Sequence, residues 1–296
     1  MIRSRLAQLA PVGWPRLARM LKEVPGCQRW AFGARSQTTG AILSLSFPHW
    51  TNELLDNPLP LSRAVELQRT AAHVLSLVQA HEVLIDSEEP PEQAAAHVLP
   101  MAALVFERFA RDFPSGHPFW PRYRELSEEQ ALSARWEALA RKRPERRLTD
   151  SMVYKLGRKG ALLRWPGFAV CMLAGRPERA QGVDALLARL LSILQLFDDT
   201  SDYAKDALSG QPNAVLAAMG SWPREDTWEL HAGAPKAIAR VGETVLGLIE
   251  RVRKDADGKL GPLLEHLQTR AQAMSQTARR RAALQAARRI FGQLSA

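Results

Sequence analysis

The chain has 296 residues, of which 46% are hydrophobic and 24% charged, and its formal net charge is +9. This composition is typical of a folded protein with one sizeable core and excludes a disordered or low-complexity chain. Alanine, leucine, arginine, glutamate and glutamine dominate, whereas β-branched and aromatic residues are scattered, which favours helix over strand. We therefore expect an all-α fold.

The cysteines and the charge pattern indicate where the protein works. Cys27 and Cys171 allow at most one disulfide and lack metal-ligand spacing, which suits a reducing compartment. Because we find neither an apolar signal segment nor about 18 uncharged apolar residues in a row, we expect a cytoplasmic protein with no membrane span. The basic clusters at 141–147 and 279–281 come without a nucleic-acid-binding motif, so we expect no nucleic-acid partner.

Apolar residues recur at helical spacing in seven segments, separated by short stretches that contain proline, glycine or serine. The segments are 62–88, 92–112, 126–143, 150–175, 182–208, 234–256 and 259–293. None of the separators is long enough to be an interdomain linker. We expect one helical bundle over residues 61–296, with residues 1–60 forming a helical or irregular segment that packs on it.

The segment 182–208 ends in an acidic stripe. Gln195, Asp198 or Asp199, Asp202 and Asp206 recur at three- and four-residue steps and so share one helix face. The preceding turns are apolar nearly all round, which places the helix inside the protein. Buried carboxylates are costly unless paired or metal-bound, so we expect basic side chains or a hard cation such as Mg²⁺ beside them. An exposed acidic helix end is the alternative.

A second acidic patch ends the segment 62–88, where Glu82, Asp86 and Glu89 share a face. The upstream part of that face is apolar and is expected to be buried. Glutamates solvated before the Pro90-Pro91 stop are the alternative interpretation. His81 lies one residue off the patch, and we expect it to pack rather than to act as a ligand.

A basic helix separates the two acidic segments. Lys155, Arg158 and Lys159 lie within one or two turns of each other. Pro166 and Gly167 are expected to break or kink the helix shortly afterwards, which would expose backbone groups to the interior. Ordinary surface cations are the alternative for these three residues.

These motifs together resemble the class I isoprenoid synthase family over roughly residues 60–290. QLFDDTSDYAKDALSGQP is similar to the family's second aspartate-rich motif with its Gly-x-Pro loop, and RKGALLRWPGFAVCMLAG is similar to its basic segment, with Gly160 in place of the usual threonine. Glu82 to Asp86 fits the D-x-x-x-D first motif of squalene synthases with one Glu-for-Asp change. The order and spacing of the three elements also match.

The resemblance implies a single-domain helical bundle with a central apolar cavity, in which carboxylates from two helices hold Mg²⁺ against a prenyl diphosphate. It assigns Asp86, Asp198, Asp199 and Asp202 to catalysis. It assigns the metal to Glu82, Asp86, Glu89, Asp198, Asp199, Asp202 and Asp206. It assigns the diphosphate to Lys155, Arg158, Lys159 and Lys205, and a substrate contact to Gln195.

The resemblance also narrows the expected reaction. The two arginines that follow the first motif in chain-elongating members are absent, and so is the N-terminal element that holds isopentenyl diphosphate. We therefore expect a Mg²⁺-dependent class I terpene synthase, an enzyme that ionises one linear allylic prenyl diphosphate. The alternatives are an elongating, head-to-head or aromatic-acceptor prenyltransferase, and a catalytically inactive helical partner subunit. A homodimer is possible because homodimers are common in this family.

Overall fold

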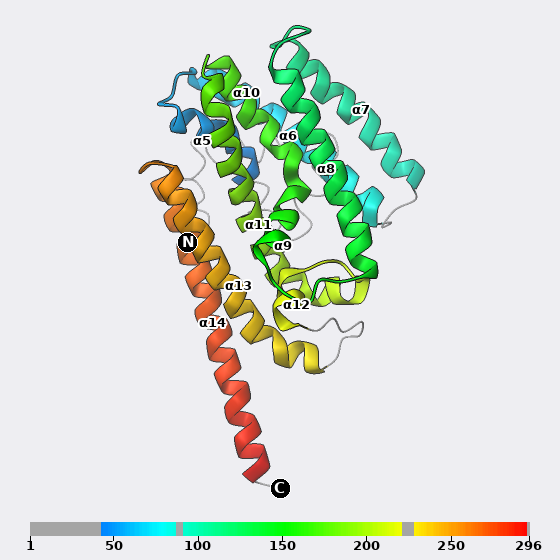
Figure 1. The fold of residues 1–296 in the computed structure, drawn as a ribbon, viewed down its shortest axis with the longest axis vertical. Helices are drawn as coiled ribbons and strands as arrows, with labels where there is room; N and C mark the ends of the chain where they lie inside the picture. The colour runs from blue at the N-terminus through cyan, green and yellow to red at the C-terminus, as the bar shows by residue number, and fades with distance from the viewer. Residues whose placement is uncertain (1–42, 87–90, 221–227, 295–296) are drawn as a thin grey trace.

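The computed structural model describes residues 43–86, 91–220 and 228–294, without the side chains of 83–86, 91–95, 97, 228–229 and 289–294. The described chain is all-α, with no strand in these ranges (Figure 1). Its α-helices are α5 (Phe47–Leu54), α6 (Leu61–Asp86), α7 (Pro91–Ala110), α8 (Phe119–Lys142), α9 (Asp150–Gly157), α10 (Trp165–Leu173), α11 (Ala180–Ser209), α12 (Ala214–Met219), α13 (Trp228–Asp255) and α14 (Gly261–Leu294). Two 3₁₀ helices are η1 (Arg158–Arg164) and η2 (Pro177–Arg179).

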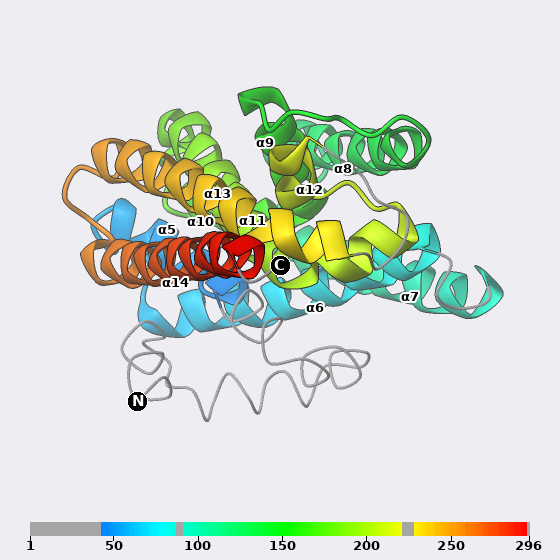
Figure 2. The ribbon, with the colours of Figure 1, turned by 90° about the horizontal axis from the view of Figure 1, so that it is seen from below.

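Helix α11 runs through the middle of the bundle and contacts α9, α10, α12, α13 and η1 (Figures 1 and 2). Most of its leucines and its isoleucine are buried on nearly every face, as an apolar run of this length requires, whereas Leu208 in the last turn is exposed. The helix ends at Gly210, whose φ of 72° suits the left-handed cap that glycine adopts most easily. The acidic stripe therefore lies at the end of a core helix.

Two helix pairs flank α11. On one side α13 and α14 pack against each other in antiparallel directions, and the C-terminal part of α14 extends beyond the rest of the bundle (Figure 1). On the other side α6 packs against α7, and α7 contacts α8 through the rings of Phe106 and Trp120 (Figure 1). The short α5 packs on α6 and α10 through buried residues that include Phe47 and Trp50. The boundary expected at residue 60 stays a prediction.

The expectation of one helix over 150–175 with a break at Pro166 is wrong. The helix breaks earlier, at η1, where Gly160 has non-helical angles (φ −101°, ψ 24°). Close packing on α11 explains the place: a Cβ on Gly157 would lie 2.1 Å from the Ser192 hydroxyl oxygen, and one on Gly160 would lie 3.1 Å from a Leu191 methyl group. Pro166 instead opens α10, because a proline in the first turn removes no helical hydrogen bond.

The remaining helices agree with the sequence expectations, with two kinds of difference. Helices α8 and α13 begin earlier than expected, at Phe119 and Trp228, and α13 continues through Pro235. Helices α5 and α12, of eight and six residues, are too short for the apolar periodicity to show. The differences thus lie at helices that continue through a proline and at helices too short to show a periodic pattern.

The segment Pro177–Ser209 is long and apolar enough to cross a membrane by length and composition alone. A buried core helix passes the same test, and 56% of its most apolar window is buried inside the bundle. This is weak evidence for a membrane span, and the absence of a span stays an expectation.

Candidate functional site

The acidic stripe is not an exposed helix end, because Asp199 is only 2% exposed. One of its carboxylate oxygens accepts a hydrogen bond of 2.8 Å from the Gln195 side-chain amide. The other accepts one of 2.7 Å from the backbone N–H of Ala214, at the start of α12. Gln195, expected to contact substrate, thus has a protein partner in Asp199.

Asn213 connects the C-terminal end of the acidic stripe to α12 through hydrogen bonds. Its Nδ2 donates to the Asp206 carboxylate over 2.7 Å and to the backbone oxygen of Asp199 over 2.9 Å. Its Oδ1 accepts from the backbone N–H of Val215 over 2.8 Å, which makes it the N-cap of α12. The sequence offered one signal for this role, an asparagine directly before a short apolar run, which is a common helix start.

Three carboxyl groups of the stripe have raised pKa values. Burial, followed by repulsion from Asp202, raises the pKa of Asp198 to about 6. Burial and then Asp206 raise the pKa of Asp199 to about 7, although Gln195 opposes the rise. Burial is also the main cause that raises the pKa of Asp206 to about 6. Positive charge beside the stripe would therefore stabilise the ionised forms.

Lys159 supplies part of that charge. Its ammonium group forms a 2.5 Å ion pair with Glu137 of α8, and the two side chains are only 17% and 8% exposed. Burial alone would lower the pKa of Lys159, but the pair with Glu137, helped by Asp199 and Glu82, raises it above its usual range. One acid that precedes Lys159 in the chain, on α6, and one that follows it, on α11, thus both attract this buried cation.

The other expected diphosphate ligands lie differently. Lys155 pairs with Glu145 over 2.7 Å and lies over the Trp136 ring. Arg158 pairs with Glu129 over 3.0 Å. Lys205 is exposed on α11 and attracts Asp198 electrostatically. Lys155 and Arg158 are therefore held by protein carboxylates, and Lys159 is the cation that the structure places among the acids of the stripe.

The first acidic motif is described only in part. Glu82 lies near the end of α6 and is exposed, yet it is close enough to Lys159 to raise its pKa. The side chain of Asp86 and all of Glu89 lie outside the described residues. Whether these two acids approach α11 stays a prediction.

Two of the four aspartates in the stripe, Asp198 and Asp202, are suited to bind magnesium. Asp199 and Asp206 already accept hydrogen bonds from Gln195, Ala214 and Asn213. Asp198 and Asp202 repel each other and are only half-buried, so they are the carboxylates that a cation could reach. The described side chains contain no group of three or more His, Cys, Asp or Glu residues converging on one point. A complete ligand set would need donors beyond α11.

A pocket of about 390 Å³ lies between α6, α7, α8, η1 and α10. Its mainly apolar lining includes His81, Leu162 and Trp165, and the Trp165 ring stacks on Tyr123 with centroids 4.0 Å apart. His81 precedes Glu82 directly, and Leu162 follows Lys159 by three residues. The lining thus includes sequence neighbours of Glu82 and of Lys159, although these two residues do not line the pocket themselves. Burial lowers the pKa of His81, as expected for a packed histidine.

Sequence reasoning missed a buried ion-pair network behind this pocket. Arg164 is 3% exposed and bonds to Glu129 over 2.5 Å and to Asp184 over 3.0 Å, and Arg122 also bonds to Asp184. The network joins α8, η1 and α11. The sequence offered one partial signal: Arg122 and Glu129, which both belong to the network, are seven residues apart and so share one face of α8.

Comparisons with protein-family models, with curated proteins and with solved structures find no match to this chain. The likeness to class I isoprenoid synthases therefore depends on the motifs quoted above.

Proposed function

We propose that the chain is a Mg²⁺-dependent enzyme of the class I terpene synthase type, which ionises one linear allylic prenyl diphosphate. The observation that carries the proposal is the position of Lys159, on which Glu82 of α6 and Asp199 of α11 both act. The two acidic motifs are 117 residues apart, counting from Glu82 to Asp199, and a shared site would account for both lying near one cation. The apolar pocket lined by Leu162 and His81, which are sequence neighbours of Lys159 and Glu82, supports the same proposal.

Each part of the site has a task in this reaction. Asp198 and Asp202 would bind magnesium, which when bound neutralises and orients the diphosphate. Lys159 would attract the same leaving group. When the bond between carbon 1 and the diphosphate oxygen breaks, both electrons leave with the diphosphate and an allylic cation remains. Loss of a proton to form an alkene, or addition of water, then completes the reaction.

The pocket suits the cation that this step produces. Apolar walls keep water from the cation, and the stacked Trp165 and Tyr123 rings offer π faces that stabilise positive charge. Gln130 is buried and lines the pocket, and its Oε1 has no hydrogen-bond partner among the described residues. An amide oxygen in this position can accept a hydrogen bond from a quenching water or stabilise the positive charge directly.

The test is incubation of the purified protein with Mg²⁺ and geranyl, farnesyl or geranylgeranyl diphosphate, with diphosphate release and extractable products as readouts. We expect release from at least one substrate, abolished by Asp198→Asn with Asp202→Asn and retained in the control Glu265→Gln, an exposed acid on α14. Urea unfolding checks that the variants fold. No release from any of the three substrates would refute the proposal.

Isopentenyl diphosphate separates the cyclase from a chain-elongating enzyme. If the products lengthen only when it is added, the protein is a prenyltransferase. Omitting it should leave the products unchanged if one allylic substrate suffices. An aromatic acceptor tested in the same way separates the third kind of transferase.

One observation favours a non-catalytic helical partner as the second candidate. Lys155, Arg158 and Lys159 are all paired with glutamates of the protein, so a diphosphate would have to compete for each of them. An inactive protein should bind no prenyl diphosphate in the presence of Mg²⁺. Binding that disappears in the Asp198→Asn, Asp202→Asn variant would exclude this candidate.

A further inference from the structure

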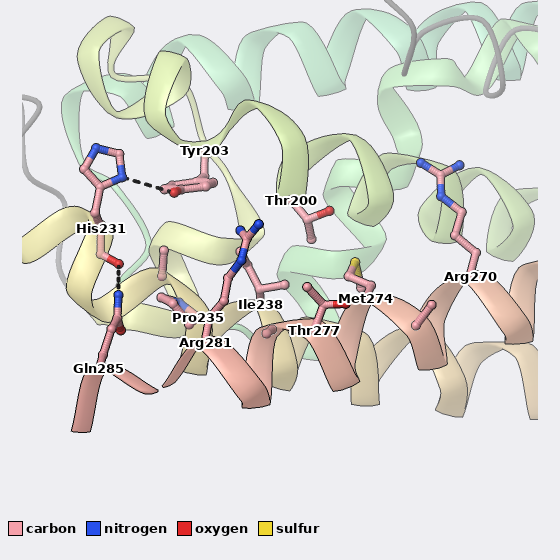
Figure 3. Close-up of a pocket in the computed structure, with 13 residues that line it drawn as sticks. Thr200, Tyr203, His231, Pro235, Ile238, Arg270, Met274, Thr277, Arg281 and Gln285 are labelled. Atoms are coloured by element: carbon pink, nitrogen blue, oxygen red, sulfur yellow. Dashed lines mark hydrogen bonds between the residues drawn. The ribbon is translucent and has the colours of Figure 1, made fainter. Parts of the chain in front are cut away.

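A second pocket, of about 610 Å³, lies between α11, α13 and α14 (Figure 3). It shares no described lining residue with the pocket beside Lys159, which is built by α6, α7, α8, η1 and α10. Its volume falls within the range of roughly 300 to 1,000 Å³ that small-molecule sites occupy. The proposed function makes no use of it.

The end of the pocket near His231 is rich in polar groups. There the Tyr203 hydroxyl lies 3.3 Å from Nδ1 of His231, and the Gln285 amide donates to the backbone oxygen of His231 over 3.3 Å (Figure 3). Arg281 rises from α14 toward α11, on the same helix face as Gln285 one turn later. This end therefore combines a hydroxyl, an imidazole and a guanidinium group.

The middle of the pocket is apolar. Ile238 of α13 and Met274 of α14 line it, together with Pro235 and small alanines. Arg270 closes the far end, where its guanidinium stacks on the Phe197 ring with the charge 4.3 Å from the ring centre. Met274 and Arg281 are seven residues apart, so the apolar middle and the cationic end are separated by about 10 Å along the helix.

The charge of the lining has one sign. Two arginines line the pocket, and none of the lining residues that the structure describes is an aspartate or glutamate. Within the described chain, Arg281 has no carboxylate within ion-pair distance, whereas its neighbour Arg279 is paired with Glu243. A pocket with a cationic end and an apolar middle is complementary to a ligand with an anionic head and an apolar tail.

We propose that this pocket binds a soluble anionic amphiphile, with its phosphate or carboxylate head on Arg281 and Tyr203 and its apolar tail along Ile238 and Met274. Arg270, which lines this pocket, also attracts Asp198, but Arg281 and Tyr203 have no part in the proposed function, so the pocket can be tested separately from it. An alkyl chain of several carbons matches the distance between the cationic end at Arg281 and the apolar middle at Met274.

Isothermal titration tests the site with three probes: decyl phosphate below its micelle concentration, decanol, and ethyl phosphate. We expect one molecule of decyl phosphate to bind per chain, at least about tenfold more tightly than either decanol or ethyl phosphate. Only decyl phosphate has both an anionic head for the cationic end and an alkyl tail for the apolar middle. Equal binding of decyl phosphate and decanol, or no binding of decyl phosphate, would overturn the proposal.

Matched variants of α14 locate the site. Arg281→Gln should weaken decyl phosphate about tenfold or more and leave decanol unchanged, and Arg281→Lys should restore part of the affinity. Arg280→Gln is the control, because Arg280 is exposed on the same helix and does not line the pocket. Equal losses in the Arg280 and Arg281 variants would show general attraction to a basic helix and would refute the assignment.

Vesicles that contain anionic lipid separate a free ligand from a membrane surface. We expect them to bind the wild type and the Arg281→Gln variant alike, because a headgroup fixed in a bilayer cannot bring its tail into the pocket. Vesicle binding that is lost only in the Arg281→Gln variant would assign Arg281 to a lipid surface and overturn the soluble ligand.

Discussion

Replacing Asp199 by asparagine should remove a large part of the pH dependence of folding. The pKa of this buried carboxyl is raised from 3.8 to about 7, chiefly by burial. An acid with a raised pKa stabilises the fold fully below its unfolded pKa and loses that contribution as the pH rises through the folded value. The wild type should therefore lose stability between pH 4 and pH 8.

The size of the effect follows from the shift. About three pKa units at roughly 1.4 kcal/mol each give an upper bound of about 4 kcal/mol for a fully buried group. Because Asp199 titrates together with Asp206, we expect roughly 2–4 kcal/mol. Asparagine keeps the local hydrogen bonds: its oxygen can accept from Ala214 N–H, and the Gln195 amide can turn over to accept from its NH₂ group.

The assay is urea unfolding of the wild type and of Asp199→Asn between pH 4 and pH 8, in buffer with a chelator so that no metal binds the stripe. The variant should match the wild type near pH 4 and exceed its free energy of unfolding by roughly 2–4 kcal/mol at pH 8. Glu265→Gln, which removes one exposed negative charge, should show no such divergence. Parallel curves for the wild type and Asp199→Asn would refute the reasoning.

Other substitutions test the packing around the site. Lys159→Gln leaves a buried glutamate on α8 without its cation and should cost roughly 3–5 kcal/mol in urea unfolding, whereas Lys155→Gln, at a cation that is 36% exposed, should cost less than about 1 kcal/mol. Two glycines of α13 should respond to alanine with opposite signs in thermal unfolding. Gly242→Ala places a Cβ 2.0 Å from the Ser275 hydroxyl oxygen and should destabilise by about 1–3 kcal/mol, but Gly247→Ala meets nothing within 4 Å and should stabilise by about 0.5–1 kcal/mol. Equal shifts for the two members of either pair would contradict the packing described.

Local patterns in the sequence predicted the long helices well. The segments 62–88 and 182–208 correspond to α6 and α11 with ends that differ by one or two residues, because apolar periodicity over many turns leaves little freedom. The break in 150–175 was misplaced for a physical reason: it depends on the contacts of Gly157 and Gly160 with α11, which lies some thirty residues further along the chain. Such a contact leaves no trace in the local pattern.

The site shows the same difference between what a local pattern predicts and what contacts between distant segments decide. Helical spacing placed the acids of α11 on one face and predicted positive charge beside them, and Lys159 lies there. It could not show that Asn213 and Ala214 would satisfy Asp206 and Asp199, because those bonds require α12 to fold back onto α11. Nor could it separate Lys159 from Lys155, since their partners on other elements decide which cation faces the stripe.

This division among the acids explains why an outside cation would bind at one end of the stripe. Asp199 and Asp206 accept hydrogen bonds from the protein, which occupy carboxylate oxygens that a metal ion would need. Asp198 and Asp202 instead repel each other, and the positive groups that attract Asp198 are Lys159, Arg270 and Lys205. Lys159 is already committed to Glu137, and Arg270 stacks on Phe197 at the edge of the second pocket. The carboxylates open to an outside cation are therefore those of Asp198 and Asp202, where magnesium would relieve the repulsion between the two.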